Sequence, residues 1–192
     1  MPNNKNLDLY FKGIIQSLVK LQKEIDSSQL EKFIEVLVDT FYSGKNVFLY
    51  GFGRSLLIGK SFSMRLMHLG FKSHVIGDVV TPPVNPDDVF LTISRTLSSE
   101  LISVAIDKAK NCKAKIIVIS SKDDSYLLKK ADNFVIVPDF KSNTANIPEM
   151  NAPLGTLFEI STMMLLDCVV IELMSRLGIT EKDMEARHAN IQ

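Results

Sequence analysis

The chain has few of the residues that build disulfide frameworks or zinc sites. It contains no tryptophan and only two cysteines, Cys112 and Cys168, which lie far apart without CxxC or Cys/His spacing. Disulfide scaffolds and zinc sites need closely patterned cysteines. The cysteine content therefore predicts structural thiols in a reducing cytoplasm and no metal cluster.

Net charge and long hydrophobic runs are also absent. The 22 basic and 22 acidic residues balance, so no overall field attracts the chain to nucleic acid or to an anionic membrane. Residues 1–5 lack the apolar core of a secretion signal. The longest apolar stretch, residues 162–174, contains Asp167 and Glu172 and is too short to span a bilayer. We expect a protein with neither a nucleic-acid nor a membrane partner, in which a phosphate could bind only at a local site.

What the sequence does contain is a regular alternation of two patterns. Its 192 residues, 46% of them hydrophobic, suffice for one domain with a substantial core. Near-continuous apolar strands that alternate with helices predict an α/β fold, a three-layer parallel sheet covered on both faces. The expected strands are 46–50, 73–76, 89–93, 115–120 and 134–137, and the expected helices between them are 55–69, 98–110 and 125–130. A loop over 138–153, a long helix over 154–177 and a short charged helix over 180–187 follow.

Two helices are expected before this alternation begins. Ser28 and Glu31 fit a capping box that opens the second helix, and Gly44 ends it. We therefore expect a single domain over 1–192, with N-terminal helices in 1–43 and the α/β core and C-terminal helices in 44–192. The first helix carries one apolar stripe at steps of four and three, made of Leu7, Phe11, Ile14, Leu18, Leu21 and Ile25.

The apolar stripe of the first helix has no obvious place in the layers of the sheet. An exposed stripe of that length is a liability for a monomer, which favours a homo-oligomer, most simply a tetramer. The alternative is that the stripe packs on its own domain.

The first candidate site is the strand-to-helix junction at residues 50–55. In open parallel sheets, ligands bind at the carboxyl ends of the strands. Here Gly53 lets the backbone approach a ligand, while Arg54 and Ser55 open a helix whose free N–H groups favour an anion.

Two other interpretations of this junction stay open. One is a plain tight turn with Arg54 in solvent. The other is dinucleotide binding, since Gly51 and Gly53 follow a strand and Asp78 follows the next one. Leu56, however, stands where that fingerprint has its third glycine.

The second candidate site is the junction at residues 93–100, which is rich in hydroxyls. One serine would explain ordinary capping of the next helix, but four hydroxyls suggest phosphate binding as well. Arg95 could add a charge-assisted contact or face solvent. The hydroxyl residues are Ser94, Thr96, Ser98 and Ser99.

Glu159 and His188 are the candidates for proton transfer. Glu159 lies between two apolar residues at the head of a helix, where desolvation would raise its pKa and make it a useful base. Its alternative role is a capping box with Thr156. His188 follows the last helix, where its alternative role is a cation that complements the helix dipole.

Several segments resemble the 6-phospho-3-hexuloisomerase family of SIS (sugar isomerase) domains. They cover nearly the whole chain in order: residues 51–55, 64–71, 81–83, 153–159 and 187–190. The resemblance implies a five-stranded parallel sheet of flavodoxin-like order in a homotetramer. It also implies conversion of D-arabino-hex-3-ulose 6-phosphate to fructose 6-phosphate in formaldehyde assimilation by the ribulose monophosphate pathway, downstream of hexulose-6-phosphate synthase.

The resemblance also assigns roles to residues. Glu159 matches the family's proposed proton acceptor, and Ser55 and the 94–99 loop match substrate-binding segments. The carbonyl moves from C3 to C2 through an enediolate, a conversion that requires neither redox cofactor nor metal. One carboxylate can serve both proton transfers, and His188 could polarise or shuttle protons at the oxygens.

The 94–99 loop departs from the family pattern. The family has Ser-Gly-Ser-Gly-x-Thr, whereas this chain has Arg95 and Leu97 in place of the glycines. We expect the backbone to wrap a phosphate less closely, while the hydroxyls of Ser94, Thr96 and Ser99 keep the register. Two alternatives to the isomerase remain: a sugar-phosphate sensor without turnover, and an isomerase of another sugar phosphate.

Overall fold

Five apolar segments pair into one parallel sheet. A computed structural model describes residues 5–123, 126–139 and 153–191. The strand order is β2-β1-β3-β4-β5, the flavodoxin-like order expected. The strands are β1 (Asn46–Tyr50), β2 (Lys72–Val75), β3 (Val89–Ile93), β4 (Lys115–Ser120) and β5 (Asn133–Ile136).

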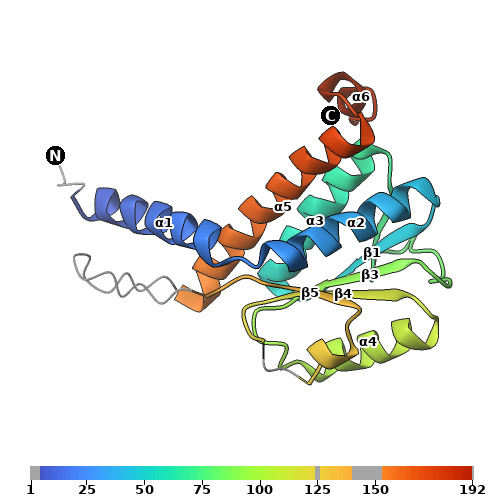
Figure 1. Cartoon of the computed structure of the whole chain (residues 1–192), viewed down its shortest axis with the longest axis horizontal. Helices are drawn as coiled ribbons and strands as arrows, with labels where there is room; N and C mark the ends of the chain where they lie inside the picture. The colour runs from blue at the N-terminus through green and yellow to red at the C-terminus, as the bar shows by residue number, and fades with distance from the viewer. Residues whose placement is uncertain (1–4, 124–125, 140–152, 192) are drawn as a thin grey trace.

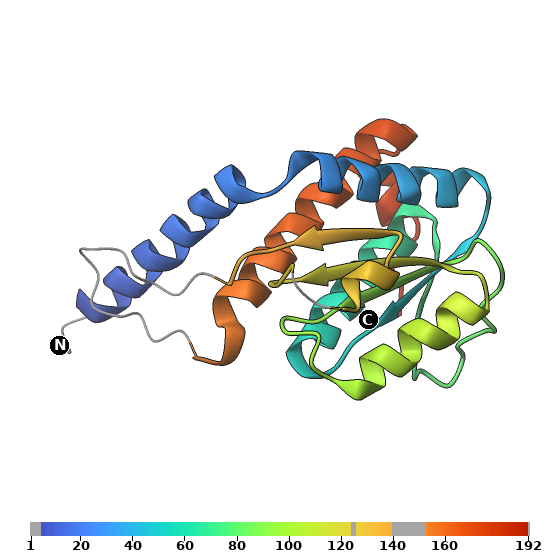
Figure 2. The ribbon, with the colours of Figure 1, turned by 60° about the horizontal axis from the view of Figure 1, so that its bottom comes forward.

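Alternate residues of the strands point to opposite faces of the sheet and belong to two separate hydrophobic cores. On β3, Leu91 and Ile93 join the larger core, while Phe90 joins the smaller core on the opposite face. The larger core is covered by α2 (Ser27–Tyr42), α3 (Gly53–Leu69) and α5 (Thr156–Leu177), and the smaller one by α4 (Glu100–Asn111) and η1 (Leu128–Lys130). Figures 1 and 2 show the sheet between these two layers.

The structure corrects two local predictions. The expected helix over 125–130 is only the 3-10 turn η1, and residue 125 lies outside the described residues. Helix α2 is capped by Asp26, whose Oδ1 accepts hydrogen bonds from the backbone N–H groups of Ser28 and Gln29. The predicted capping box is therefore wrong, and Glu31 instead forms a two-pronged ion pair with Arg176 of α5. Of the expected loop over 138–153, residues 140–152 lie outside the described residues.

Helix α1 (Lys5–Glu24) projects from the domain (Figures 1 and 2). The C-terminal part of its stripe packs on its own domain, because Leu21 is buried and Ile25 joins the larger core. The N-terminal part does not, since Leu7 and Phe11 are 51% and 60% exposed. The apolar outer face of α1 consists of Leu7, Tyr10, Phe11, Ile15 and Val19.

The C-terminal segment returns to the far end of α3. After α5 comes the short helix α6 (Glu181–Glu185), opened by a capping box between Thr180 and Asp183. Arg187 then donates a hydrogen bond to the backbone carbonyl of His68, near the last residue of α3. In the described ranges, none of the helices has the length and apolar character that crossing a membrane requires.

Candidate active site at the carboxyl edge of the sheet

The two candidate junctions lie against each other. Strands β1 and β3 are neighbours, so both junctions open at the same edge of the sheet. A Cβ atom on Gly51 would lie 3.0 Å from the carbonyl oxygen of Ile93, a spacing that few real side chains tolerate. The 50–55 turn and the start of the 94–99 loop therefore form one continuous site.

Three helices begin at this edge, and none of them has a side-chain cap among the described residues. The N-caps of α3, α4 and α5 are Phe52, Ser99 and Gly155. Gly53 and Ser55 lie in the first turn of α3. Because the first N–H groups of a helix have no partner within it, these ends favour an anion.

Arg54 and Glu159 meet at the start of α3 and α5. Arg54 Nε lies 2.7 Å from Glu159 Oε2, in the geometry of an ion pair and not of an aligned hydrogen bond. The arginine side chain is 54% exposed and the glutamate 11%. A second guanidinium nitrogen, Nη1, is 3.5 Å from Thr156 Oγ1.

Burial dominates the electrostatics of Glu159. Desolvation raises the pKa of this carboxyl above its ordinary value, because charge is disfavoured away from water. The positive charges of Arg54 and, more weakly, Arg95 oppose the rise, and the negative charge of Asp139 adds to it. Glu159 is thus a carboxylate that holds its proton more tightly than one in water, as a general base needs to.

The capping-box interpretation of Glu159 is wrong. The N-cap of α5 is Gly155, with φ of 85°, so Thr156 is already the first helical residue. Glu159 consequently sits one position too far along the helix to complete a box. Its carboxylate faces Arg54 instead.

Arg95 lies across the start of α5. Its Nη1 is 2.9 Å from Asp139 Oδ2, and a Cβ atom on Gly155 would lie only 2.6 Å from Arg95 Cδ. Position 155 favours glycine because its φ of 85° is left-handed and because Arg95 would have to shift to admit a Cβ atom. The sequence reasoning missed Asp139, although its place just after the carboxyl end of β5 (Asn133–Ile136) was the signal that could have found it.

The 94–99 loop contains a left-handed residue, Leu97, at a position where the family pattern has glycine. Leu97 has φ of 54° and is buried in the smaller core. A left-handed residue other than glycine costs about 1–2 kcal/mol, which the burial of the leucine side chain offsets. Ser94 Oγ accepts a hydrogen bond from the backbone N–H of Leu97, and the hydroxyls of Thr96 and Ser98 lie 2.8 Å apart.

His188 is not part of this site within one chain. Its ring stacks on that of His68, with centroids 5.1 Å apart, near the last residue of α3. Arg54 lies at the first turn of the same helix. A helix of 17 residues is about 25 Å long, so α3 separates His188 from Glu159.

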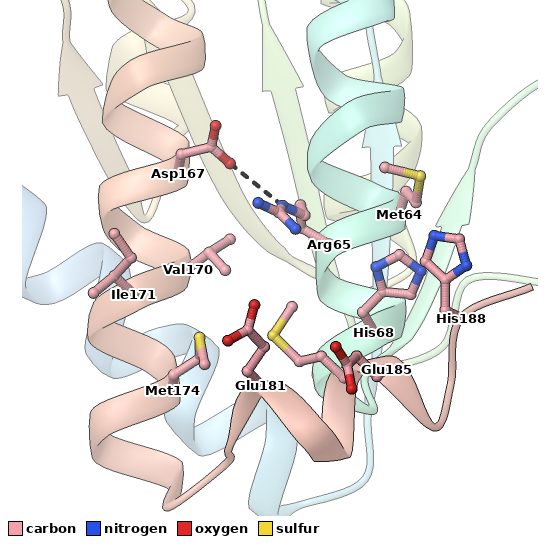
Figure 3. A pocket seen from close by; sticks show the side chains of 11 residues that line it. Met64, Arg65, His68, Asp167, Val170, Ile171, Met174, Glu181, Glu185 and His188 are labelled. Atoms are coloured by element: carbon pink, nitrogen blue, oxygen red, sulfur yellow. Dashed lines mark ion pairs between the residues drawn. The ribbon is translucent and has the colours of Figure 1, made fainter.

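His188 instead borders a pocket of about 420 Å³ between α3, α5 and α6 (Figure 3). The two histidine rings form one wall, and Arg65 faces Asp167 across another, with Nε and Oδ1 3.5 Å apart. Burial and the neighbouring His188 lower the pKa of His68 below its ordinary value. The other lining residues include Met64, Val170, Ile171, Met174, Glu181, Met184 and Glu185.

The described part of the chain contains no side-chain cluster typical of a metal or redox centre. No group of three or more His, Cys, Asp or Glu side chains there could hold a metal ion. Cys112 and Cys168 are exposed and unpaired with each other. Asp78, the candidate ribose ligand of the dinucleotide interpretation, accepts a contact from Lys60 Nζ at 3.2 Å.

Comparison with known proteins identifies the family to which this site belongs. Residues 40–154, more than half of the chain, match the SIS domain. The chain belongs to the SIS domain family. This SIS domain is 41% identical over 147 residues to the 3-hexulose-6-phosphate isomerase of Methylomonas aminofaciens, across 76% of this chain and 80% of the relative.

Two further comparisons relate this SIS domain to 3-hexulose-6-phosphate isomerases within the family. The 3-hexulose-6-phosphate isomerase of Methanocaldococcus jannaschii is 32% identical over 178 residues, which cover 93% of this chain and 94% of the relative. A Methanococcus jannaschii crystal structure, for which a 3-hexulose-6-phosphate isomerase function was inferred, superposes with a TM-score of 0.80 at 33% identity and covers 97% of this chain and 98% of that one. This SIS domain is accordingly a sugar-phosphate isomerase.

Proposed function

We propose that the protein converts D-arabino-hex-3-ulose 6-phosphate to fructose 6-phosphate in the cytoplasm. The observation that carries the proposal is the nearly buried carboxylate of Glu159, which lies beside Arg54 at the uncapped start of α3. A base and an anion site thus share one edge of the sheet. The relatives named for the same reaction support the choice of substrate.

Glu159 acts as the base in both halves of the reaction. It removes the proton from C2, and the electron pair that is left forms the C2–C3 double bond while the C3 carbonyl becomes an enediolate oxygen. The hydroxyl proton at O2 is transferred to O3, the C2 carbonyl forms, and Glu159 returns its proton to C3. C2 is oxidised and C3 is reduced within the same substrate molecule, so the reaction requires no external oxidant.

The phosphate binds at the 94–99 loop and the adjoining helix starts. Ser94, Thr96 and Ser99 supply hydroxyls, and the N–H groups of α3 and α4 supply further donors. This group is remote from the reacting carbons, so its binding energy positions them over Glu159. Hexulose-6-phosphate synthase supplies the substrate.

His188 reaches the site from a second subunit of a homotetramer. Within one chain, α3 separates it from Glu159, so its proposed role at the substrate oxygens requires another copy. The apolar outer face of α1, defined above, is the surface that such an assembly would cover.

Turnover is tested with hexulose 6-phosphate generated by a coupled synthase and detection of fructose 6-phosphate. We expect steady formation of product that stops when the synthase is omitted. Binding of fructose 6-phosphate without turnover would instead indicate a sensor. If the protein converts another sugar phosphate but not hexulose 6-phosphate, it is an isomerase of that other substrate.

Shared sites are tested by mixing two inactive variants, Glu159→Gln and His188→Ala. In random co-assembly about a quarter of the sites combine an intact Glu159 with an intact His188 from a second copy. We expect that fraction of wild-type activity to return on co-expression. No recovery in co-purified mixed oligomers would place His188 outside the site.

A further inference from the structure

Arg54 lies between the carboxylate of Glu159 and a helix start that favours an anion. It lies in the first turn of α3, where the unpaired N–H groups favour a phosphate, and it is also paired to Glu159. Its side chain is half exposed, whereas that of Glu159 is nearly buried. The guanidinium therefore remains accessible to a second anion, whereas the carboxylate is enclosed by protein.

From this arrangement, and resting on the proposed function, we propose that Arg54 is a positioning residue that restrains Glu159 until the phosphate of the substrate binds. The phosphate, seated between the starts of α3 and α4, draws the guanidinium away from the carboxylate. Glu159 is then left buried and unpaired next to the reacting carbons. Binding of the correct ligand thereby produces a stronger base.

The geometry of the pair favours such an exchange. The contact between Arg54 Nε and Glu159 Oε2 is not an aligned hydrogen bond, so the pair lacks the two aligned hydrogen bonds that make arginine–carboxylate pairs strong. A phosphate dianion offers more charge and three acceptor oxygens to the same five N–H donors. The close approach of Gly51 to Ile93 also places the hydroxyl loop beside the helix turn that carries Arg54.

The other charges that face Glu159 cannot take over this role. Arg95, from the loop after β3, is held by Asp139 in an ion pair of 2.9 Å. Asp139, from the segment after β5, is negative and strengthens the proton affinity of Glu159. On α3, Arg54 is the charged residue that acts on the carboxylate directly.

The proposal is tested by carboxyl carbon-13 NMR, which follows the titration of Glu159 without any turnover. Wild type is titrated with and without inorganic phosphate, alongside Arg54→Gln and the control Arg65→Gln on the same helix. We expect phosphate to raise the pKa of Glu159 in wild type, and Arg54→Gln to raise it without phosphate. Phosphate should then add little in Arg54→Gln, and Arg65→Gln should behave as wild type.

Kinetics supply the second readout. We expect Arg54→Gln to weaken inorganic phosphate inhibition about tenfold or more, because a charged hydrogen bond is lost. The acid limb of kcat/KM, which reports the free enzyme, should move to higher pH in Arg54→Gln and return in Arg54→Lys. An unchanged limb, or a Glu159 titration that is indifferent to both phosphate and Arg54→Gln, overturns the proposal.

The outcomes separate this inference from the proposed function. If wild type turns over hexulose 6-phosphate but Arg54→Gln leaves the titration of Glu159 unchanged, the inference fails alone. If phosphate raises the pKa of Glu159 in wild type but not in Arg54→Gln, and no sugar phosphate is isomerised, the proposed function fails. The transfer of Arg54 from Glu159 to the phosphate then serves no catalytic step.

Discussion

The carboxylate of Glu159 lies where two opposing influences act on its pKa. Burial raises the pKa, and the nearby guanidinium of Arg54 lowers it, with burial the larger. A residue of this kind is unfavourable for folding at neutral pH, since its charge is poorly solvated. Its presence at an edge where three uncapped helices begin favours the proposed catalytic role.

Replacement of this single side chain should separate catalysis from binding. We expect Glu159→Gln to lower turnover of hexulose 6-phosphate on the order of a hundredfold or more, because an amide keeps the shape but cannot accept the proton. Affinity for fructose 6-phosphate, measured by calorimetry, should stay within a few-fold. A variant that retains half of wild-type turnover would reduce Glu159 to a structural residue.

The same variant should also change stability in a pH-dependent way. The pKa of Glu159 is raised in the folded protein, so the folded state binds the proton more tightly than the unfolded chain does. The free energy of unfolding therefore falls as pH rises from the unfolded pKa through the folded one.

We accordingly expect Glu159→Gln to be more stable than wild type above the folded pKa of Glu159. The difference should shrink as pH falls below its unfolded pKa, when both side chains are neutral. Urea denaturation over a pH series measures it. A variant less stable than wild type at pH 8 would contradict the direction of the shift.

At the scale of elements, the proposed phosphate site depends on the 94–99 loop. We expect Thr96→Val and Ser99→Ala each to weaken fructose 6-phosphate binding about tenfold or more, since each removes a hydroxyl from a charged acceptor, a contact that contributes about 1.5–3 kcal/mol. Arg95→Ala should weaken binding only if the arginine leaves Asp139 for the ligand. Ser103→Ala, one turn inside α4 (Glu100–Asn111), is the matched control. Two hydroxyl variants that bind as wild type does would remove the loop from the phosphate site.

The elements were predictable from the sequence where a local pattern determines them. Strands β1, β3 and β4 have the predicted bounds, because each is a short, almost uninterrupted apolar run buried on both faces. The bounds of β2 and β5 shifted by one residue, as expected at the sheet edges. Residues 125–130 were mistaken for a helix because one turn of 3-10 helix shows the same spacing.

The site was predictable only in part, because contacts between distant residues leave no local pattern. The two junctions could be placed at one edge from strand order alone. The pairing of Arg54 with Glu159, across more than 100 residues, depends on how α3 and α5 pack. The stacking of His188 on His68 likewise depends on the path of the last segment.

At the scale of the whole molecule, the outer face of α1 determines the expected assembly. We expect light scattering to give a mass near four times the 21.5 kDa of one chain. The double variant Phe11→Glu, Ile15→Glu should lower that mass, because it places charges on the face to be buried. Val104→Glu, at a position of similar exposure on α4, is the control and should not. A monomer of wild type at micromolar concentration would rule the prediction out.

The position of α1 also bears on how the chain is made. Leu21 of α1 packs in the core that contains residues of α5 (Thr156–Leu177), so the first helix synthesised needs the last long one. Roughly 130 residues separate Glu24 from Thr156. At about 5–20 residues per second, a ribosome needs roughly 7–26 seconds to bridge that interval. Throughout it α1 lacks its contacts with α5, and its apolar side chains stay accessible to chaperones.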